Sequence, residues 1–238
     1  MTTGFQGRRV LVAGGTSGVG LAAAGEFAAR GAGVTVVSRS EDKVRRAVQV
    51  LGPTADGQVL DLRDAEGIAA FAKAAGTFDH VVVSAAETPM GRVDTLPLED
   101  AYAAMDSKFW GAYRLARAVS VDPAGSLTFV AGYLSVRPGK ASALQSAINA
   151  ALEALVRGLA LELAPIRVNA VSPGLLRTPL WDALPADRRA AMYEAAAQRL
   201  PVNRVGEPQD VAAAIAMVAD NAYMTGTTLF VDGGGSIA

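Results

Sequence analysis

The fold is decided by residues 9–20, which read Arg9-Val10-Leu11-Val12-Ala13-Gly14-Gly15-Thr16-Ser17-Gly18-Val19-Gly20. A short apolar run leads into a glycine-rich stretch, and an alanine-rich segment of helical period follows. This order predicts a strand, a tight turn and a helix. Glycines let backbone N–H groups approach a pyrophosphate, whose charge a helix N-terminus favours. The spacing differs from G-x-G-x-x-G and glycine also serves simple turns, but the context favours nucleotide binding by Gly14, Thr16, Ser17, Gly18, Val19 and Gly20.

Short valine-rich runs and longer alanine-rich segments alternate along the rest of the chain. Strands are predicted at Arg9–Ala13, Val34–Ser38, Gln58–Asp61, His80–Ser84, Ser126–Ala131, Arg167–Val171 and Thr228–Val231. Helices are predicted at Val19–Arg30, Asp42–Leu51, Ala65–Ala75, Leu98–Val119, Ala141–Leu163 and Pro208–Ala219. Such alternation is typical of repeated βαβ units. We therefore expect an α/β protein with a Rossmann-like, doubly wound, seven-stranded parallel sheet, helices on both faces, and a single domain over residues 1–238.

Composition excludes several function classes. The 238 residues are 51% apolar and 6% aromatic, with a net charge of -1 and no run of Lys or Arg, so no footprint for nucleic acid or an anionic membrane is expected. Without cysteine there is no disulfide, and the lone His80 cannot build a His-rich metal site, so no metal is expected. Met1–Arg9 lacks the apolar stretch of a secretory signal. These features predict a cytoplasmic protein whose partners are small molecules or its own copies.

The segment from Pro173 to Pro208 is longer than an ordinary connection. It carries five prolines and a short helical stretch between Ala186 and Leu200. Such excursions usually serve as lids or substrate loops. Its apolar residues predict an apolar small-molecule substrate, although an amphipathic lid would need the same residues to pack on its own protein. They are Leu175, Leu176, Leu180, Trp181, Leu184 and Met192.

Residues at two further predicted strand ends indicate which dinucleotide is bound. Where an NAD-binding protein usually carries an acid for the ribose 2′-hydroxyl, this chain has Ser38 and Arg39. A guanidinium there can hold a 2′-phosphate, so we expect NADP(H), with NADPH preferred over NADH. The alternative is a solvated turn arginine. Asp61 and Leu62 follow at the edge where an adenine would lie, unless Asp61 caps a helix.

Further segments occur in the order found in one known family. Gly14, Gly18 and Gly20 fit the pattern TGxxxGxG, with Ala13 in place of its Thr. Downstream come Asp61, Ser84-Ala85-Ala86 in place of Asn-Ala-Gly, Ile166-Arg167-Val168-Asn169, Ser172-Pro173-Gly174, Thr178, Arg204-Val205-Gly206-Glu207-Pro208, Asp210-Val211-Ala212, Thr225-Gly226 and Val231-Asp232-Gly233-Gly234. From its first strand to its C-terminus the chain resembles a short-chain dehydrogenase/reductase. The resemblance implies cofactor contacts from Asp61, Leu62, Ser84, Ala85, Ala86, Pro173, Gly174 and, at the nicotinamide carboxamide, Thr178.

The catalytic positions of this family are not matched. Members that transfer hydride carry an Asn on the fourth long helix, a Ser after the fifth strand, and a Tyr and a Lys in Y-x-x-x-K on the next helix. Alignment on the run Ala-Ala-Leu-Glu-Ala-Leu places Gln145 at the Tyr and Asn149 at the Lys, and counting back places Gly132 at the Ser. Alignment on Trp110-Gly111 places Lys108 at the Asn. Neither Gln145 nor Gly132 can supply a proton, so the usual relay is expected to be absent.

Three functions stay open. The first is an oxidoreductase with an unidentified carbonyl, alcohol or imine substrate, in which Lys108, Tyr133 or Ser135 polarises the substrate and Asn149 bonds the nicotinamide ribose. A desolvated ammonium there would have a lowered pKa and could donate a proton. The alternative is that Lys108 pairs with Asp106 or a partner subunit and that Tyr133 packs in a loop. The second function is an NADP(H)-binding sensor or partner subunit, and the third is a non-redox isomerase or lyase.

Self-association is implied by the same resemblance. Similar proteins pack the long fourth and fifth helices into dimers and the C-terminal strand into tetramers, so a homodimer or homotetramer is expected. Trp110, Tyr113 and Leu155 would supply apolar surface on those helices, and core packing explains the same residues almost as well.

Overall fold

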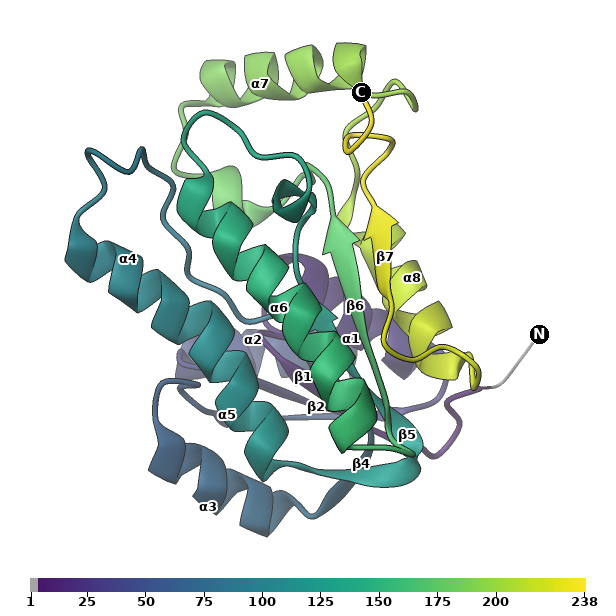
Figure 1. Cartoon of the computed structure of the whole chain (residues 1–238). Helices are drawn as coiled ribbons and strands as arrows, with labels where there is room; N and C mark the ends of the chain where they lie inside the picture. The colour runs from purple at the N-terminus through teal and green to yellow at the C-terminus, as the bar shows by residue number, and fades with distance from the viewer. Residues whose placement is uncertain (1–3) are drawn as a thin grey trace.

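One parallel sheet organises the computed structural model, which describes residues 4–238; Met1–Thr3 of the amino-terminal segment lie outside the described residues. The strand order is β3-β2-β1-β4-β5-β6-β7 (Figure 1). The strands are β1 (Arg9–Ala13), β2 (Gly33–Ser38), β3 (Ala55–Val59), β4 (Thr77–Val83), β5 (Ser120–Val130), β6 (Arg167–Pro173) and β7 (Thr228–Val231). All six neighbouring pairs are parallel, which confirms the predicted seven-stranded, Rossmann-like sheet.

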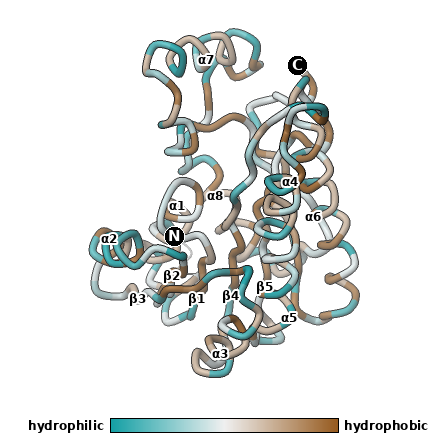
Figure 2. Tube along the Cα trace, turned by 90° about the vertical axis from the view of Figure 1, so that its left-hand side faces the viewer, coloured by the Kyte–Doolittle hydropathy of each residue, from teal (hydrophilic) through white to brown (hydrophobic). Residues whose placement is uncertain are grey.

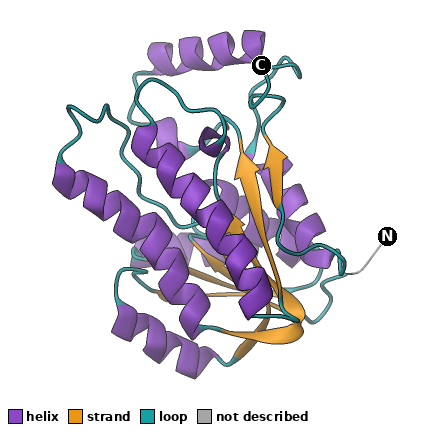
Figure 3. Ribbon diagram, in the orientation of Figure 1, coloured by secondary structure: helices purple, strands orange, loops and turns teal. Residues whose placement is uncertain are grey.

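Helices cover both faces of this sheet. They are α1 (Gly18–Ala29), α2 (Glu41–Leu51), α3 (Ala65–Ala75), α4 (Leu98–Met105), α5 (Gly111–Ala118), α6 (Ala143–Glu162), α7 (Ala186–Arg199) and α8 (Pro208–Asp220). One apolar core joins the sheet to α3, α5 and α6, and the other joins it to α1, α2 and α8. Figures 2 and 3 show the layers, with α1 and α2 on one side of the strands and α5 and α6 on the other. Since both faces are covered, the central strand β1 is apolar and buried over most of its length.

Three predicted strands begin several residues too late. The fourth was expected at His80–Ser84 and lies at Thr77–Val83. The third was expected at Gln58–Asp61 and lies at Ala55–Val59. The predicted range included Leu60 and Asp61, which belong to the connection after the strand. The real β3 is an edge strand whose Gly57 lies under α2, where a Cβ would come within 2.5 Å of Val44 Cγ1. The fifth strand starts at Ser120 rather than Ser126, because Ser120 pairs with Thr77 before an irregularity in the register.

The predicted long helix over Leu98–Val119 is not continuous. A π-helical turn at Asp106–Trp110 separates α4 from α5. The segment holds no proline, and glycine first appears at Gly111, after the turn. Insertions of this kind occur often at functional sites and redirect the side chains they carry. The turn carries Lys108.

The excursion after β6 forms a small layer of its own. Tyr193 and Ala196 of α7 pack with Val205, and Leu175, Trp181 and Met192 lie against them. Three of the six apolar residues that suggested an apolar substrate, Leu175, Trp181 and Met192, therefore pack within the excursion, and Leu176 is buried in the core that joins the sheet to α1 and α8. Leu180 and Leu184 are the exceptions, at 72% and 36% exposed. Figure 1 shows α7 lying across the end of the molecule beyond the carboxyl ends of β6 and β7.

Two surface features bear on the remaining expectations. Trp110 and Tyr113 are 46% and 39% exposed, whereas Leu155 is partly buried against the core under α6. The homodimer or homotetramer stays a prediction. Within residues 4–238, the helices lack the combination of length and apolarity that a bilayer-spanning segment requires.

Candidate functional site

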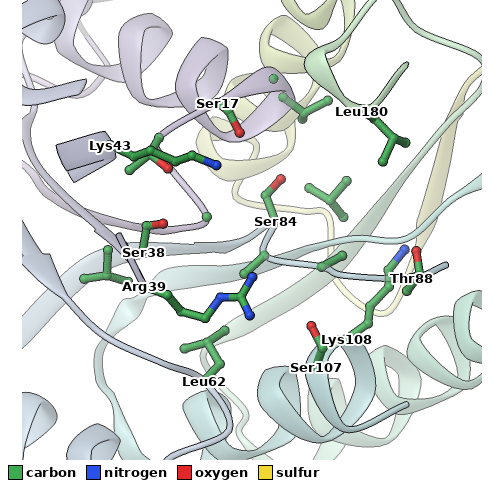
Figure 4. Close-up of a pocket in the computed structure, with 18 of the residues that line it drawn as sticks. Ser17, Ser38, Arg39, Lys43, Leu62, Ser84, Thr88, Ser107, Lys108 and Leu180 are labelled. Carbon is green, nitrogen blue, oxygen red and sulfur yellow. The ribbon is translucent and has the colours of Figure 1, made fainter. Parts of the chain in front are cut away.

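The carboxyl ends of six strands open onto one cavity of about 470 Å³. It lies where β1 and β4 are neighbours, the point at which the strand order reverses and where open α/β sheets bind ligands. Figure 4 shows polar side chains from widely separated segments around it. The predicted cofactor residues that line it are Gly14, Thr16, Ser17, Gly18, Val19, Ser38, Arg39, Asp61, Leu62, Ser84, Ala85, Ala86 and Thr178.

The glycine-rich turn makes the floor of this cavity because its residues have no side chains to fill it. Gly14 and Gly18 adopt φ angles of +82° and +50°, the region that glycine enters at low energy. A Cβ at Gly14 would lie 2.5 Å from the Ala85 backbone nitrogen. Gly20 does not line the cavity; a Cβ there would lie 2.1 Å from Gly14 O, so its role is to let α1 pack closely on the turn.

The first turn of α1 is open to an anion. Ser17 occupies the N-cap position but makes no side-chain hydrogen bond to the helix, and no acid occurs in the first turn. The amino end of a helix carries unsatisfied N–H groups and a partial positive charge. The residues at this turn therefore fit the pyrophosphate of a dinucleotide, both in the space that the glycines leave and in electrostatic sign.

Basic side chains gather at the opposite end of the cavity, next to β2 and β3. Arg39 donates to Glu87 Oε2 at 2.8 Å, and Lys43 of α2 lines the same wall. Asp61 accepts from Arg63, whose hydrogen bond lowers the pKa of the Asp61 carboxyl. The N-cap of α3 is Asp64, so Asp61 is not its cap. This end of the cavity is lined by three basic side chains, Arg39, Lys43 and Arg63.

Lys108 enters the other end of the cavity from the π-helical turn (Figure 4). Its Nζ donates to Ala131 O at 2.9 Å and to Asn149 Oδ1 at 2.6 Å. An ammonium has three N–H donors, so one is left for a ligand. Burial lowers the pKa of Lys108 to about 8, and the negative charge of Glu153 partly opposes that effect. The structure thus places Lys108 at the cavity, and its role beside a cofactor stays a prediction.

The alternative in which Lys108 pairs with Asp106 is wrong. Asp106 is bound by Arg114, with Nη2 of the arginine 2.6 Å from Oδ1. Asp106 and Lys108 are two residues apart on a helical segment, so their side chains face different sides, and Lys108 turns toward α6. The ammonium is left with two neutral partners.

The other residues proposed for proton transfer lie away from the cavity. Tyr133 and Ser135 belong to a short 3₁₀ helix after β5 and do not line it. The Ser135 hydroxyl donates to Glu153 Oε1 at 2.7 Å. Gln145 is 5% exposed and its amide nitrogen donates to Pro89 O, so it faces the segment after β4. Lys108 is therefore the one of these groups in contact with the cavity.

Gly132 and Asn149 fit one another. A Cβ at Gly132 would lie 2.8 Å from Asn149 Nδ2, so any side chain there would displace the amide that binds Lys108. Asn149 is 4% exposed and stands behind Lys108 rather than on the cavity wall. Its amide is therefore placed to orient Lys108, and its expected direct contact with a nicotinamide ribose stays a prediction.

Pro173 and Gly174 also stand behind the wall. Pro173 ends β6 opposite Val231, and Gly174 N donates to Val231 O at 3.0 Å. A Cβ at Gly174 would lie 2.7 Å from Asp232 Cα, so this glycine is required by close packing of the last strand. Both residues support the segment that brings Thr178 to the cavity.

The cavity includes polar residues that the sequence analysis missed, among them Lys43, Arg63, Thr88 and Ser107. Position supplies a usable signal for two of them. Lys43 lies in the first turn of the helix after β2, and Arg63 follows Asp61 at the end of β3. Because ligands bind outside the carboxyl ends of parallel strands, basic residues in both connections are candidates. The sequence carries no such signal for Ser107, because that residue lies within a stretch of helical pattern.

Known proteins of this kind match nearly the whole chain. The family described as enoyl-(acyl carrier protein) reductase matches residues 13–236. The short-chain dehydrogenase/reductase ucsE of Acremonium sp is 33% identical over 251 residues, covering 96% of this chain and 95% of the relative. A galactitol 2-dehydrogenase of Cereibacter sphaeroides is 32% identical over 245 residues, covering 97% and 95%. A solved small-chain dehydrogenase in complex with NADPH is 35% identical with a TM-score of 0.81, covering 98% of this chain and all of the other. The sheet, the glycine turn and these matches together place the chain in the short-chain dehydrogenase/reductase family of oxidoreductases.

Proposed function

We propose that this protein is an NADP(H)-dependent oxidoreductase of a carbonyl, alcohol or imine substrate in which Lys108 replaces the usual tyrosine as proton donor. The observation that carries the proposal is the placement of Lys108 Nζ at the cavity, bonded to Asn149 Oδ1 and Ala131 O with one donor left. No other candidate acid named from the sequence reaches the cavity wall.

The cofactor assignment rests on the floor of the cavity and on its basic end. The glycine turn and the uncapped first turn of α1 suit a pyrophosphate. Arg39 and Lys43 suit the additional phosphate that distinguishes NADP(H) from NAD(H). The NADPH complex of a relative at 35% identity supports the same cofactor. Bound there, the nicotinamide supplies or accepts a hydride.

The chain's own part in the reaction is to hold and move a proton. Asn149 and Ala131 O fix the direction of the ammonium, and its third N–H points at the substrate oxygen or nitrogen that gains a proton on reduction. With a pKa of about 8, Lys108 is mostly protonated at neutral pH and gives up its proton more readily than an exposed lysine. Reduction should therefore slow as the pH rises through about 8.

The test is a pair of lysine substitutions. Lys108→Met keeps an unbranched side chain without the ammonium, and kcat for NADPH-dependent reduction should fall by about 10²- to 10⁴-fold while NADPH binding is retained. Lys140→Met, on an exposed lysine before α6, is the matched control. A panel of ketones, aldehydes, quinones and imines supplies the substrate, with NADPH oxidation followed by absorbance.

Each outcome bears on the assignment. Unchanged turnover in Lys108→Met removes Lys108 as the donor. NADPH binding to the wild type without oxidation across the panel favours a sensor or partner subunit, and failure to bind either dinucleotide removes the cofactor assignment as well.

A further inference from the structure

One carboxylate is buried among the residues that the structure describes. Glu153, on α6, is 8% exposed and is the only Asp or Glu in the buried class between residues 4 and 238. It lies one helical turn after Asn149, between the core residues Leu152 and Val156. Acids are rarely buried unless a cation or several hydrogen-bond donors accompany them. Glu153 therefore calls for a partner.

Two hydroxyl groups meet one oxygen of this carboxylate. Ser135 Oγ donates to Glu153 Oε1 at 2.7 Å, and Ser172 Oγ donates to the same oxygen at 3.2 Å. Ser172 is fully buried at the end of β6. Both hydroxyls are donors to a single acceptor oxygen of the carboxylate. The hydroxyls are neutral, however, so the negative charge still has no counter-charge in direct contact.

The positive charge that acts on this carboxylate is that of Lys108, which is bound to Asn149 on the same helix as Glu153. Asn149 and Glu153 are four residues apart and share a face of α6. Lys108 is bound to Asn149, and no carboxylate lies within ion-pair distance of its ammonium among the described residues. The field of Glu153 acts on Lys108, raising a pKa that burial lowers. Asn149 thus binds a partly buried cation and lies one helical turn along α6 from a buried anion.

Other charged groups around Lys108 have closer partners of their own. Asp106, on the same turn, is bound by Arg114 of α5, and the Arg39 and Asp61 side chains along the cavity are bound to Glu87 and Arg63. The loop after β5 contributes Tyr133, a phenol off the cavity wall. Glu153 is therefore the acid whose negative charge acts on Lys108.

We propose that Glu153 is a positioning residue whose buried carboxylate keeps Lys108 in its ammonium form, oriented through Asn149. The inference rests on the proposed function for its catalytic meaning, although the charge coupling itself does not require turnover. Ser135 belongs to this arrangement as a donor to Glu153 rather than as an acid acting on substrate.

The experiment replaces the charge and follows the lysine directly. Glu153→Gln keeps the shape and an oxygen acceptor for the two hydroxyls but removes the negative charge. The chain has four lysines, Lys43, Lys73, Lys108 and Lys140, so ¹³C-lysine labelling gives a small set of Cε resonances whose pH titrations separate, with Lys108→Met as the assignment. In Glu153→Gln the Lys108 titration should move to lower pH by about one unit, a tenfold change in the ammonium-to-amine ratio.

The pH dependence of reduction supplies the second readout, and the shift of the Lys108 titration fixes the direction in which it should change. If Lys108 donates the proton, the high-pH loss of reduction should move down with it by about one unit. Glu162→Gln, on the exposed end of the same helix, is the matched control and should leave both curves in place. Glu153→Asp, which retains the charge, should restore most of the titration.

The outcomes separate the two proposals. A Lys108 titration that moves by less than about 0.3 pH units in Glu153→Gln overturns the role of Glu153. If the Lys108 titration moves but the high-pH loss of reduction does not, the role of Glu153 stands and Lys108 is not the proton donor. Should Glu153→Gln fail to fold, Glu153→Leu gives a second neutral side chain of similar volume with the same expected direction, since buried charges are often replaced by apolar groups without loss of stability.

Discussion

Replacing Arg39 by alanine tests the cofactor assignment at a single side chain. Arg39 reaches from the end of β2 to Glu87 in the segment after β4, and β1 lies between those two strands in the sheet. The ion pair therefore spans the end of β1, above the glycine turn. A dinucleotide with a 2′-phosphate must draw the guanidinium away from Glu87.

The expected magnitude follows from that exchange. A hydrogen bond between charged groups is worth about 1.5–3 kcal/mol, and release of an exposed ion pair such as Arg39 with Glu87 costs about 0.2–1 kcal/mol. The net contribution to NADPH binding is thus about 1–2 kcal/mol, so Arg39→Ala should weaken NADPH by about 5- to 30-fold. NADH, which has no 2′-phosphate, should lose much less.

Isothermal titration with both dinucleotides measures the ratio directly. Glu87→Gln is the companion variant: it removes the competitor for Arg39 and should strengthen NADPH by about two- to fivefold. Asp42→Asn, which breaks an exposed pair with Arg45 on α2, is the control for a general change in charge. Equal losses of NADPH and NADH in Arg39→Ala would refute the reading of the β2 terminus as a 2′-phosphate site.

Two further substitutions, at Gly132 and at His80, test the packing beside Lys108 and the loss of stability in acid. Gly132→Ser should lower the free energy of unfolding by about 1–3 kcal/mol and weaken the contact between Asn149 and Lys108, because the new Cβ would lie 2.8 Å from Asn149 Nδ2. Thermal denaturation measures the loss, and a melting temperature equal to that of the wild type would contradict this packing. Burial lowers the pKa of His80 from 6.5 to about 4, so the folded protein binds that proton more weakly than the unfolded chain and stability should fall by about 3 kcal/mol between pH 6.5 and pH 4. In His80→Gln, the free energy of unfolding measured by urea denaturation should fall less steeply between pH 6.5 and pH 4. The same pH dependence as in the wild type would show that another group causes the acid sensitivity.

The sheet was predictable because its signal is repeated along the chain. Valine-rich runs alternate with segments of helical period, as repeated βαβ units require, and both β1 and β7 lie at the expected residues. The third strand was displaced since an edge strand contributes little apolar pattern and the buried Leu60 and Leu62 follow it. The π-helical turn has no local sequence mark, because its hydrogen bonding depends on the packing of the turn against α6.

The site was predictable where backbone dictates it and less so where side chains meet. Gly14 and Gly18 mark their own positions, since few other residues adopt their φ angles. The contact of Lys108 with Asn149 joins residues on separate helices, and the sequence indicated only that each stands at an unusual position. Glu153 had a signal that went unused: an acid between Leu152 and Val156 on the face of α6 that packs against the sheet.

The π-helical turn between α4 and α5 accommodates one residue more than a turn of regular α-helix. Because the wider turn absorbs that residue, α5 keeps nearly the direction it would have after a regular helix. Loss of a single residue from Asp106–Trp110 would therefore restore a regular helix with little rotation of α5, and the main effect would fall on the direction of the Lys108 side chain, which the turn carries toward α6. The length of this short segment thus matters for the placement of one ammonium group rather than for the packing of the two helices.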